Sequence, residues 1–162
     1  MDACRALTLD DIPRMVEINE QGLPGTGKVS EEEMADLLQL SELALGLDNE
    51  TGLAGFVLCL LPGTRYGSLN YAWFNQKFQQ FLYVDRIAVT AEHRSRKIGS
   101  SLYAKVFFEA NRLRVPVAAE VSLEPPNPGS MRFHFRHEFQ EVGVLRHESK
   151  SVTMMMRPHQ KI

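Results

Sequence analysis

The stretch Phe81–Val89 (FLYVDRIAV) constrains the fold most, because it is an almost unbroken apolar run of strand length. Such a run is typical of a central strand that is covered on both faces. A helix is expected after it, since apolar residues recur there at helical spacing: Ile98, Leu102, Val106, Ala110 and Leu113. Another apolar run, Val115–Val121, is expected to form a strand. The sequence therefore predicts a strand–helix–strand crossover within a mixed α/β fold.

Helices are expected before this crossover, and further strands on both sides of it. Capping boxes predict one helix after Thr8, with Asp11 as its partner, and another after Ser30, with Glu33 as its partner. The remaining expected strands are Cys4–Leu7, Leu43–Leu47, Leu53–Leu61, Phe139–Leu145 and Ser151–Met156. A short helix is expected over Asn127–His137, and a long aromatic loop over Pro62–Gln79.

Length and composition limit the classes of protein. The 162 residues are expected to form a single domain, residues 1–162, with 44% hydrophobic residues. The net charge of −2 provides no basic surface for nucleic acid and does not favour an anionic membrane. The chain has no apolar run of about 18 residues, and Cys4 and Cys59 are expected to be thiols rather than a disulfide. A cytoplasmic location is therefore expected.

A basic turn separates the central strand from the helix that follows it. The turn contains Arg94, Arg96 and Lys97, and Gly99 lies at the expected start of the helix. A helix N-terminus carries partial positive charge and exposed N–H groups, so it can hold a phosphate. Glycine allows a ligand to approach the backbone closely. Charge alone would favour an ordinary solvated turn, but the position of this segment between a strand and a helix, with Gly99 at the helix start, indicates a phosphate-binding turn.

This turn and a second segment resemble the GNAT acetyltransferase family. Arg94-Ser95-Arg96-Lys97-Ile98-Gly99 is similar to the family's Arg/Gln-x-x-Gly-x-Gly/Ala signature, with Lys97 in place of a Gly, which is sterically possible if its φ is negative. Downstream, Asn127, Ser130, Phe133 and Phe139 match the family in position and kind. His134 replaces the usual Tyr there, and Glu138 replaces the usual Gly.

The resemblance implies a fold and a co-substrate. The implied fold has a mixed, mostly antiparallel sheet of about seven strands, with two splayed parallel central strands and about four flanking helices. The co-substrate would be acetyl-coenzyme A (acetyl-CoA), and no metal is expected. The residues implied to bind it are Ile87, Ala88 and Val89 for the pantetheine, Arg94, Ser95, Arg96, Lys97, Ile98, Gly99 and Ser100 for the pyrophosphate, and in addition Asn127 and Ser130.

Three residues are candidates for proton transfer to or from the reacting groups. Glu120 is the candidate base, because a carboxylate in an apolar strand retains its proton to higher pH. The alternative is a strand carboxylate paired with an arginine. His134 stands where the family has its Tyr acid, and the alternative is a histidine on a helix surface. Asp85 is a second base or a substrate contact, or else a structural ion pair with Arg86.

The acceptor is expected to be a small-molecule or peptide amine, and a homodimer is compatible with the resemblance. Aromatic side chains are candidates for the substrate wall: Tyr83, Tyr71 and Trp73. A domain that binds acyl-CoA without turnover is the alternative to an enzyme. A remote alternative is a nucleotide-binding P-loop at residues 22–29, although Val29 stands where that motif needs a hydroxyl.

Overall fold

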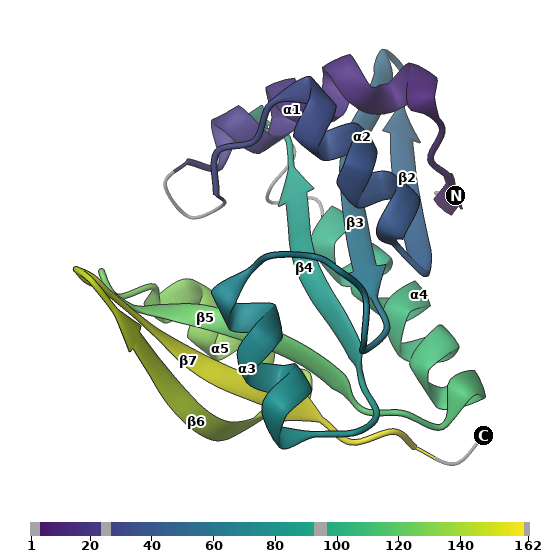
Figure 1. Ribbon diagram of the computed structural model, residues 1–162. Coiled ribbons are helices and arrows are strands. Elements are labelled where there is room, and N and C mark those ends of the chain that lie inside the picture. Colours follow the sequence, from purple (N-terminus) through teal and green to yellow (C-terminus); the bar gives the residue numbers. More distant parts are fainter. Residues whose placement is uncertain (1–3, 24–26, 93–96, 161–162) are drawn as a thin grey trace. The chain divides into compact units, whose positions relative to one another are not determined.

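The computed structural model describes residues 4–23, 27–92 and 97–160 (Figure 1). Its seven-stranded sheet has the order β1-β2-β3-β4-β5-β7-β6. The strands β4 and β5 run parallel, and the other registered pairs are antiparallel. The elements in chain order are β1 (Cys4–Ala6), the 3-10 helix η1 (Leu9–Asp11), α1 (Ile12–Gln21), α2 (Glu31–Leu40), β2 (Leu43–Asn49), β3 (Gly52–Leu60), α3 (Leu69–Lys77), β4 (Leu82–Val89), α4 (Ile98–Leu113), β5 (Val117–Glu124), α5 (Pro128–Arg136), β6 (Gln140–His147) and β7 (Lys150–Arg157).

The mixed α/β fold and the central crossover predicted from the sequence are confirmed. The apolar run forms β4, the periodic segment forms α4, and the next run forms β5. The chain divides into two compact units, residues 1–60 with 84–108 and residues 61–83 with 109–162.

The first unit is built on the β2–β3 hairpin and the helices α1 and α2, which pack against each other and against β3 (Figure 1). Its helices bury Met15, Ile18 and Met34 completely, and β3 buries Phe56. The capping box predicted for α2 is present, because Ser30 Oγ accepts from the Glu33 N–H and the Glu33 carboxylate accepts from the Ser30 N–H. Local sequence thus fixes where this helix starts.

The second unit is built on β5, β7 and β6. Ala119 of β5 pairs with Met155 of β7, and Val144 of β6 pairs with Thr153 of β7. At the start of β4, Tyr83 pairs in parallel with Ala118 of β5. This last pairing places the start of β4 beside β5, the strand that contains Glu120.

The prediction of a continuous loop over Pro62–Gln79 is wrong, because α3 forms inside it. The Ser68 hydroxyl accepts from the N–H of Tyr71 and caps the helix. Tyr71 and Phe74, three residues apart, are both buried. Only these two residues form the buried face of the helix. A repeat this short cannot be told from the scattered aromatic residues of a loop.

No helix in the described part of the chain is long and apolar enough to cross a membrane. Cys4 and Cys59 form no disulfide, as expected. Burial, together with the negative charge of Asp85, raises the pKa of the Cys59 thiol. This thiol is therefore protonated at neutral pH.

Trp73 of α3 packs onto the backbone of β6 at Gly143. A Cβ atom at this glycine would lie 2.5 Å from Cζ2 of the Trp73 indole. The indole also contacts two neighbours on α3. The Phe74 ring packs edge-on against it with 5.1 Å between ring centroids, and the Lys77 ammonium lies 5.3 Å from the ring centroid. The glycine is thus what lets α3 lie directly on this strand.

Gly143→Ala is expected to destabilise the protein by about 1–3 kcal/mol, the usual cost of forcing an extra methyl group into a packed site. Urea denaturation gives the change in the free energy of unfolding. Gly129→Ala is the control, since its nearest contact would be 3.9 Å away. An unchanged unfolding midpoint for Gly143→Ala would show that the indole does not rest on this strand.

Candidate active site

Glu120 lies in the middle of β5, half-buried between the buried residues Ala119 and Val121. Its Oε1 atom accepts a hydrogen bond of 2.8 Å from the Tyr83 hydroxyl and one of 2.9 Å from Asn70 Nδ2. Both donors are neutral groups. They stabilise the carboxylate form without neutralising its charge, so the group can still accept a proton.

The two donors come from different elements of the second unit. Tyr83 is fully buried at the start of β4, and its ring lies 5.4 Å from that of Tyr71. Asn70 lies in the first turn of α3, which Ser68 caps. Sequence reasoning identified Tyr83 as a substrate contact and missed Asn70. The Tyr83 hydroxyl donates to Glu120, and a contact of Tyr83 with a substrate stays a prediction.

Tyr71 and Trp73, the other predicted substrate contacts, have partners within the same unit. The Tyr71 hydroxyl donates to the carbonyl of Leu61 and accepts from the backbone N–H of Thr64. Its ring is 1% exposed. With Trp73 packed on Gly143, both side chains hold α3 in place. Their contact with a substrate stays a prediction.

Asp85, in the first unit, forms the ion pair that was the alternative to a catalytic role. The Arg86 Nε atom donates to Asp85 Oδ2 at 2.8 Å, and both side chains are largely buried. Arg86 also donates to Asn19 Oδ1 and to the carbonyl of Gly27. The pair therefore ties β4 to α1 and to the segment after it. A role for Asp85 in proton transfer stays a prediction.

The end of β4 presents the residues expected to hold pantetheine. Ile87 and Val89 are half-buried, whereas Ala88 is buried. Within the first unit, the N–H of Thr90 donates to the carbonyl of Ala54, which fixes the end of the strand. Three residues of the predicted phosphate-binding turn, Arg94, Ser95 and Arg96, lie outside the described residues.

Lys97 does not meet the condition of a negative φ, under which a lysine is sterically easy. Its φ is 60°, in the left-handed region that favours glycine. Glu138, the other residue that stands where the family usually has glycine, has a φ of 70°. Both positions thus keep a glycine-like backbone although the residue has changed. The left-handed conformation costs a non-glycine residue roughly 1–2 kcal/mol.

The first turn of α4 begins at Ile98, which is buried, and continues through Gly99 and Ser100, which are half-buried. A Cβ atom at Gly99 would meet no atom of the described residues within 4 Å. The described part of the chain therefore leaves open space beside this backbone, and its own packing does not require a glycine there.

The helix α5 contains the other expected cofactor contacts and His134. Asn127 caps the helix by accepting from the N–H of Ser130. His134 is 6% exposed, so it is not a surface histidine. Its Nδ1 lies 2.8 Å from the carbonyl of Ser130 and therefore carries the hydrogen. Burial lowers the pKa of His134, and the nearby His137 adds to the effect.

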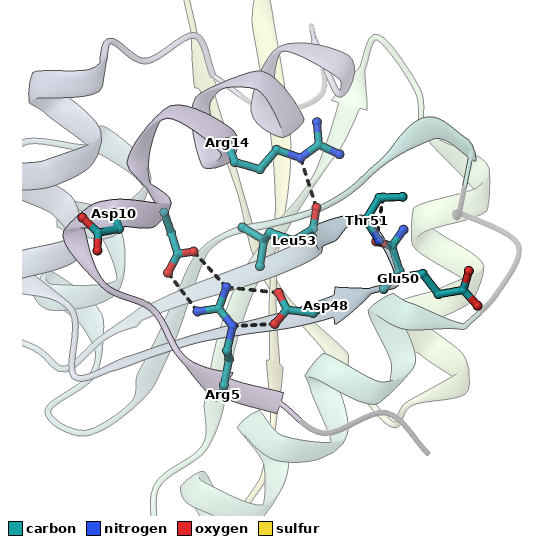
Figure 2. A pocket seen from close by; sticks show the side chains of 10 residues that line it. Arg5, Asp10, Arg14, Asp48, Glu50, Thr51 and Leu53 are labelled. Atoms are coloured by element: carbon teal, nitrogen blue, oxygen red, sulfur yellow. Dashed lines mark hydrogen bonds and ion pairs between the residues drawn. The ribbon is translucent and has the colours of Figure 1, made fainter.

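Among the surface hollows of the described residues, two that lie in the first unit contain no predicted site residue. One, of about 570 Å³, surrounds Arg5 (Figure 2). All five N–H groups of Arg5 are engaged, by Asp11, Asp48 and the carbonyl of Ala6. This guanidinium therefore links β1, η1 and β2 and is not available for an anionic ligand. The other hollow, of about 770 Å³, lies between residues 7–9 and α2.

The P-loop alternative does not fit the first unit. That motif needs a strand immediately before the glycine-rich loop. The segment before the loop is the helix α1, and Val29, at the position of the required hydroxyl, is buried. The described part of the chain also holds no cluster of three or more side chains that could bind a metal.

Comparisons with known proteins agree with the fold and identify the class. The family model for the acetyltransferase (GNAT) family matches residues 14–139. The chain therefore belongs to the GNAT acetyltransferase family and is a transferase enzyme. No curated protein matches the sequence.

Solved structures with the same fold share little sequence with this chain. Ard1 from Thermoplasma volcanium has a TM-score of 0.79 at 16% identity, with 99% of each chain covered. The ribosomal-protein-S18-alanine N-acetyltransferase from Escherichia coli has a TM-score of 0.77 at 16% identity, with 100% of this chain and 96% of that chain covered. Arabidopsis thaliana NAA60, solved with a bisubstrate analogue, has a TM-score of 0.77 at 14% identity, with 98% of each chain covered. At these identities the likeness shows the fold alone.

The lowered pKa of His134 predicts a loss of stability in mild acid. The unfolded chain takes up a proton near pH 6.5, whereas the folded protein does so only at lower pH. Stability should therefore fall as the pH drops below about 6.5, by up to about 1.4 kcal/mol per pH unit for one proton. His134→Gln should reduce this slope between pH 7.5 and 5.5, as measured by urea denaturation.

The exposed His159 provides the control, and His159→Gln should keep the full slope. The pKa of His137 is also lowered by burial, so His137 should contribute to the pH dependence of stability that remains in His134→Gln. An equal slope in the wild type and His134→Gln would mean that His134 is protonated as readily in the folded protein as in the unfolded chain.

Proposed function

We propose that this enzyme transfers the acetyl group of acetyl-CoA directly to a primary amine, with Glu120 as the general base. The observation that carries the proposal is the Glu120 carboxylate on β5, half-buried and held by two neutral donors. Membership of the GNAT family supports acetyl-CoA as the donor. Two of the similar structures, both from Arabidopsis thaliana, were solved with bisubstrate analogues.

The amine must lose a proton for the reaction to proceed. Its nitrogen attacks the thioester carbonyl carbon, the C–S bond breaks, and coenzyme A leaves as a thiolate. At pH 7, deprotonation costs about 4.6 kcal/mol for a lysine-like amine of pKa ~10.4, and about 1.1 kcal/mol for an α-amine near 7.8. Glu120 would take this proton, which contributes most when the acceptor is lysine-like.

Direct transfer is preferred over an acetyl-cysteine intermediate at Cys59. A nucleophilic cysteine must react as its thiolate, and such cysteines have a lowered pKa and partial exposure. Cys59 is fully buried, and its pKa is raised. The transfer therefore needs one proton acceptor and, for the departing thiolate, one proton source.

His134 is proposed as that proton source, with a smaller effect on rate than the base. Its lowered pKa keeps the ring mostly neutral at pH 7, with the one hydrogen on Nδ1 directed to the Ser130 carbonyl, so only the imidazolium form, which carries a second hydrogen on Nε2, could donate to the thiolate. The imidazolium form is scarce under these conditions. The coenzyme A thiolate is also a fair leaving group, because a thiol has a pKa near ~8.5.

Acetyl-CoA is proposed to lie along the end of β4 and the start of α4. Ile87, Ala88 and Val89 would bind pantetheine through their backbone groups. The pyrophosphate would meet the N–H groups and charges of residues 94–100, where Gly99 leaves open space among the described residues. Asn127 and Ser130 complete the proposed set. Residues 1–162 are proposed to form one catalytic domain.

Glu120→Gln is expected to lower kcat by roughly 10²–10⁴, the usual range for loss of a general base, with little change in acetyl-CoA affinity. Glutamine keeps the shape and can still accept from Asn70 and Tyr83, but it cannot take the proton. Steady-state kinetics with a panel of amines from pH 6 to 9 measures the effect.

The matched control is Glu124→Gln, which changes an exposed carboxylate on the same strand. It should keep normal turnover. If Glu120→Gln is active and Asp85→Asn is not, the base is Asp85. If neither substitution matters, solvent removes the proton.

Gly99→Ala tests the coenzyme site separately from the chemistry. Alanine meets no described residue there and suits a helix better than glycine, so unfolding stability should hold or rise by up to about 1 kcal/mol. The added methyl group should weaken coenzyme A binding about tenfold, which corresponds to 1.4 kcal/mol. Titration calorimetry measures the affinity.

Gly67→Ala is the control for this substitution. Its Cβ would likewise meet nothing within 4 Å among the described residues, but it lies in the segment before α3. It should bind coenzyme A normally. Normal binding by Gly99→Ala as well would remove the start of α4 from the coenzyme site.

A further inference from the structure

We infer that Asn70 is a positioning residue that orients the carboxylate of Glu120 for proton transfer. This inference rests on the proposed function, because it assigns Asn70 a role only through the base. Asn70 lies on α3, far from Glu120 in sequence, and donates from Nδ2 to Glu120 Oε1 at 2.9 Å. The other donor to this oxygen is the Tyr83 hydroxyl at 2.8 Å.

Two donors from two elements hold one carboxylate oxygen. Tyr83 approaches it from the start of β4, and Asn70 approaches it from the first turn of α3. A single donor would leave the carboxylate able to turn about its side-chain torsions. Two donors on different secondary-structure elements restrict these torsions and so fix the orientation of the Glu120 carboxylate. Rate depends steeply on such placement, since an error of 1 Å costs about 10²-fold.

The hydrogen bond to Glu120 also fixes which way the Asn70 amide faces. The carboxylate oxygen can only accept, so Nδ2 must face it and Oδ1 must point away. Oδ1 is buried and has no hydrogen-bond partner in the described part of the chain. A buried carbonyl without a partner is destabilising. Stability alone would therefore not favour an amide at position 70. The amide is explained if its NH₂ group is needed to donate a hydrogen bond to Glu120.

The choice of a neutral donor matters for the chemistry. A lysine or arginine at this position would pair with the carboxylate and hold its proton affinity low. An amide stabilises the ionised form more weakly and so leaves the carboxylate able to accept a proton. Removing the amide should make Glu120 hold its proton to higher pH. The acidic limb of the kcat/KM profile should therefore move to higher pH.

The test compares Asn70→Ala with Asn75→Ala, a change on the same helix. Asn75 Oδ1 accepts from the N–H of Gly63, so its role is structural. Asn70→Ala should lower kcat roughly tenfold or more, the size expected for losing a hydrogen bond to a charged group, and should move the acidic limb upward. KM for acetyl-CoA and the melting temperature should hardly change. Asn75→Ala should lower the melting temperature and leave the pH profile in place.

Asn70→Asp provides a second variant of the same shape. It replaces the donor by an acceptor of like charge, so it should move the acidic limb further than Asn70→Ala does. A wild-type pH profile and kcat in both variants would overturn the inference, whether or not they are less stable.

A double-mutant cycle distinguishes failure of this inference from failure of the proposed base. If Asn70 acts through Glu120, Asn70→Ala should add little to the loss already caused by Glu120→Gln. Fully additive losses would overturn the inference while leaving Glu120 as the base. Normal turnover by Glu120→Gln alone would overturn the proposed base itself, and the positioning role of Asn70 with it.

Discussion

A carboxylate inside an apolar strand is unfavourable unless other groups hydrogen-bond to it, and the second unit is organised around meeting this demand at Glu120. The Tyr83 hydroxyl requires the start of β4 to lie beside β5, and Tyr83 pairs there with Ala118. The hydrogen bond from the Asn70 amide requires α3 to lie close enough to β5 for Nδ2 to reach Glu120. Trp73 then anchors α3 on Gly143. Each of these contacts supports the same carboxylate.

Features encoded by neighbouring residues could be predicted from the sequence. The run Phe81–Val89 gave β4 to within one residue, and the pair Ser30 and Glu33 gave the start of α2. Glu120 was found because a charge in an apolar strand is conspicuous without knowledge of its partners. These signals are local, since they depend on periodicity, capping and the contrast of one residue with its neighbours.

Features that depend on contacts distant in sequence could not be predicted. Asn70 is an ordinary loop asparagine until α3 forms and brings it to a strand 50 positions away. The packing of Trp73 on Gly143 could not be predicted either, because an aromatic residue in a connecting segment gives no sign of the glycine that it will contact. The positive φ of Lys97 was likewise hidden, since side-chain identity alone favours negative φ. In each case the partner, or the backbone path, decides the role.

Mass spectrometry of a reaction with acetyl-CoA and a panel of primary amines tests the proposed group transfer most directly. The panel should include peptide α-amines, lysine side chains and polyamines. The expected result is an N-acetylated product formed in step with released coenzyme A, and no acetyl group left on the protein. Tight binding of acetyl-CoA without any acetylated amine would contradict it, and would identify a domain that binds the thioester without transferring its acyl group.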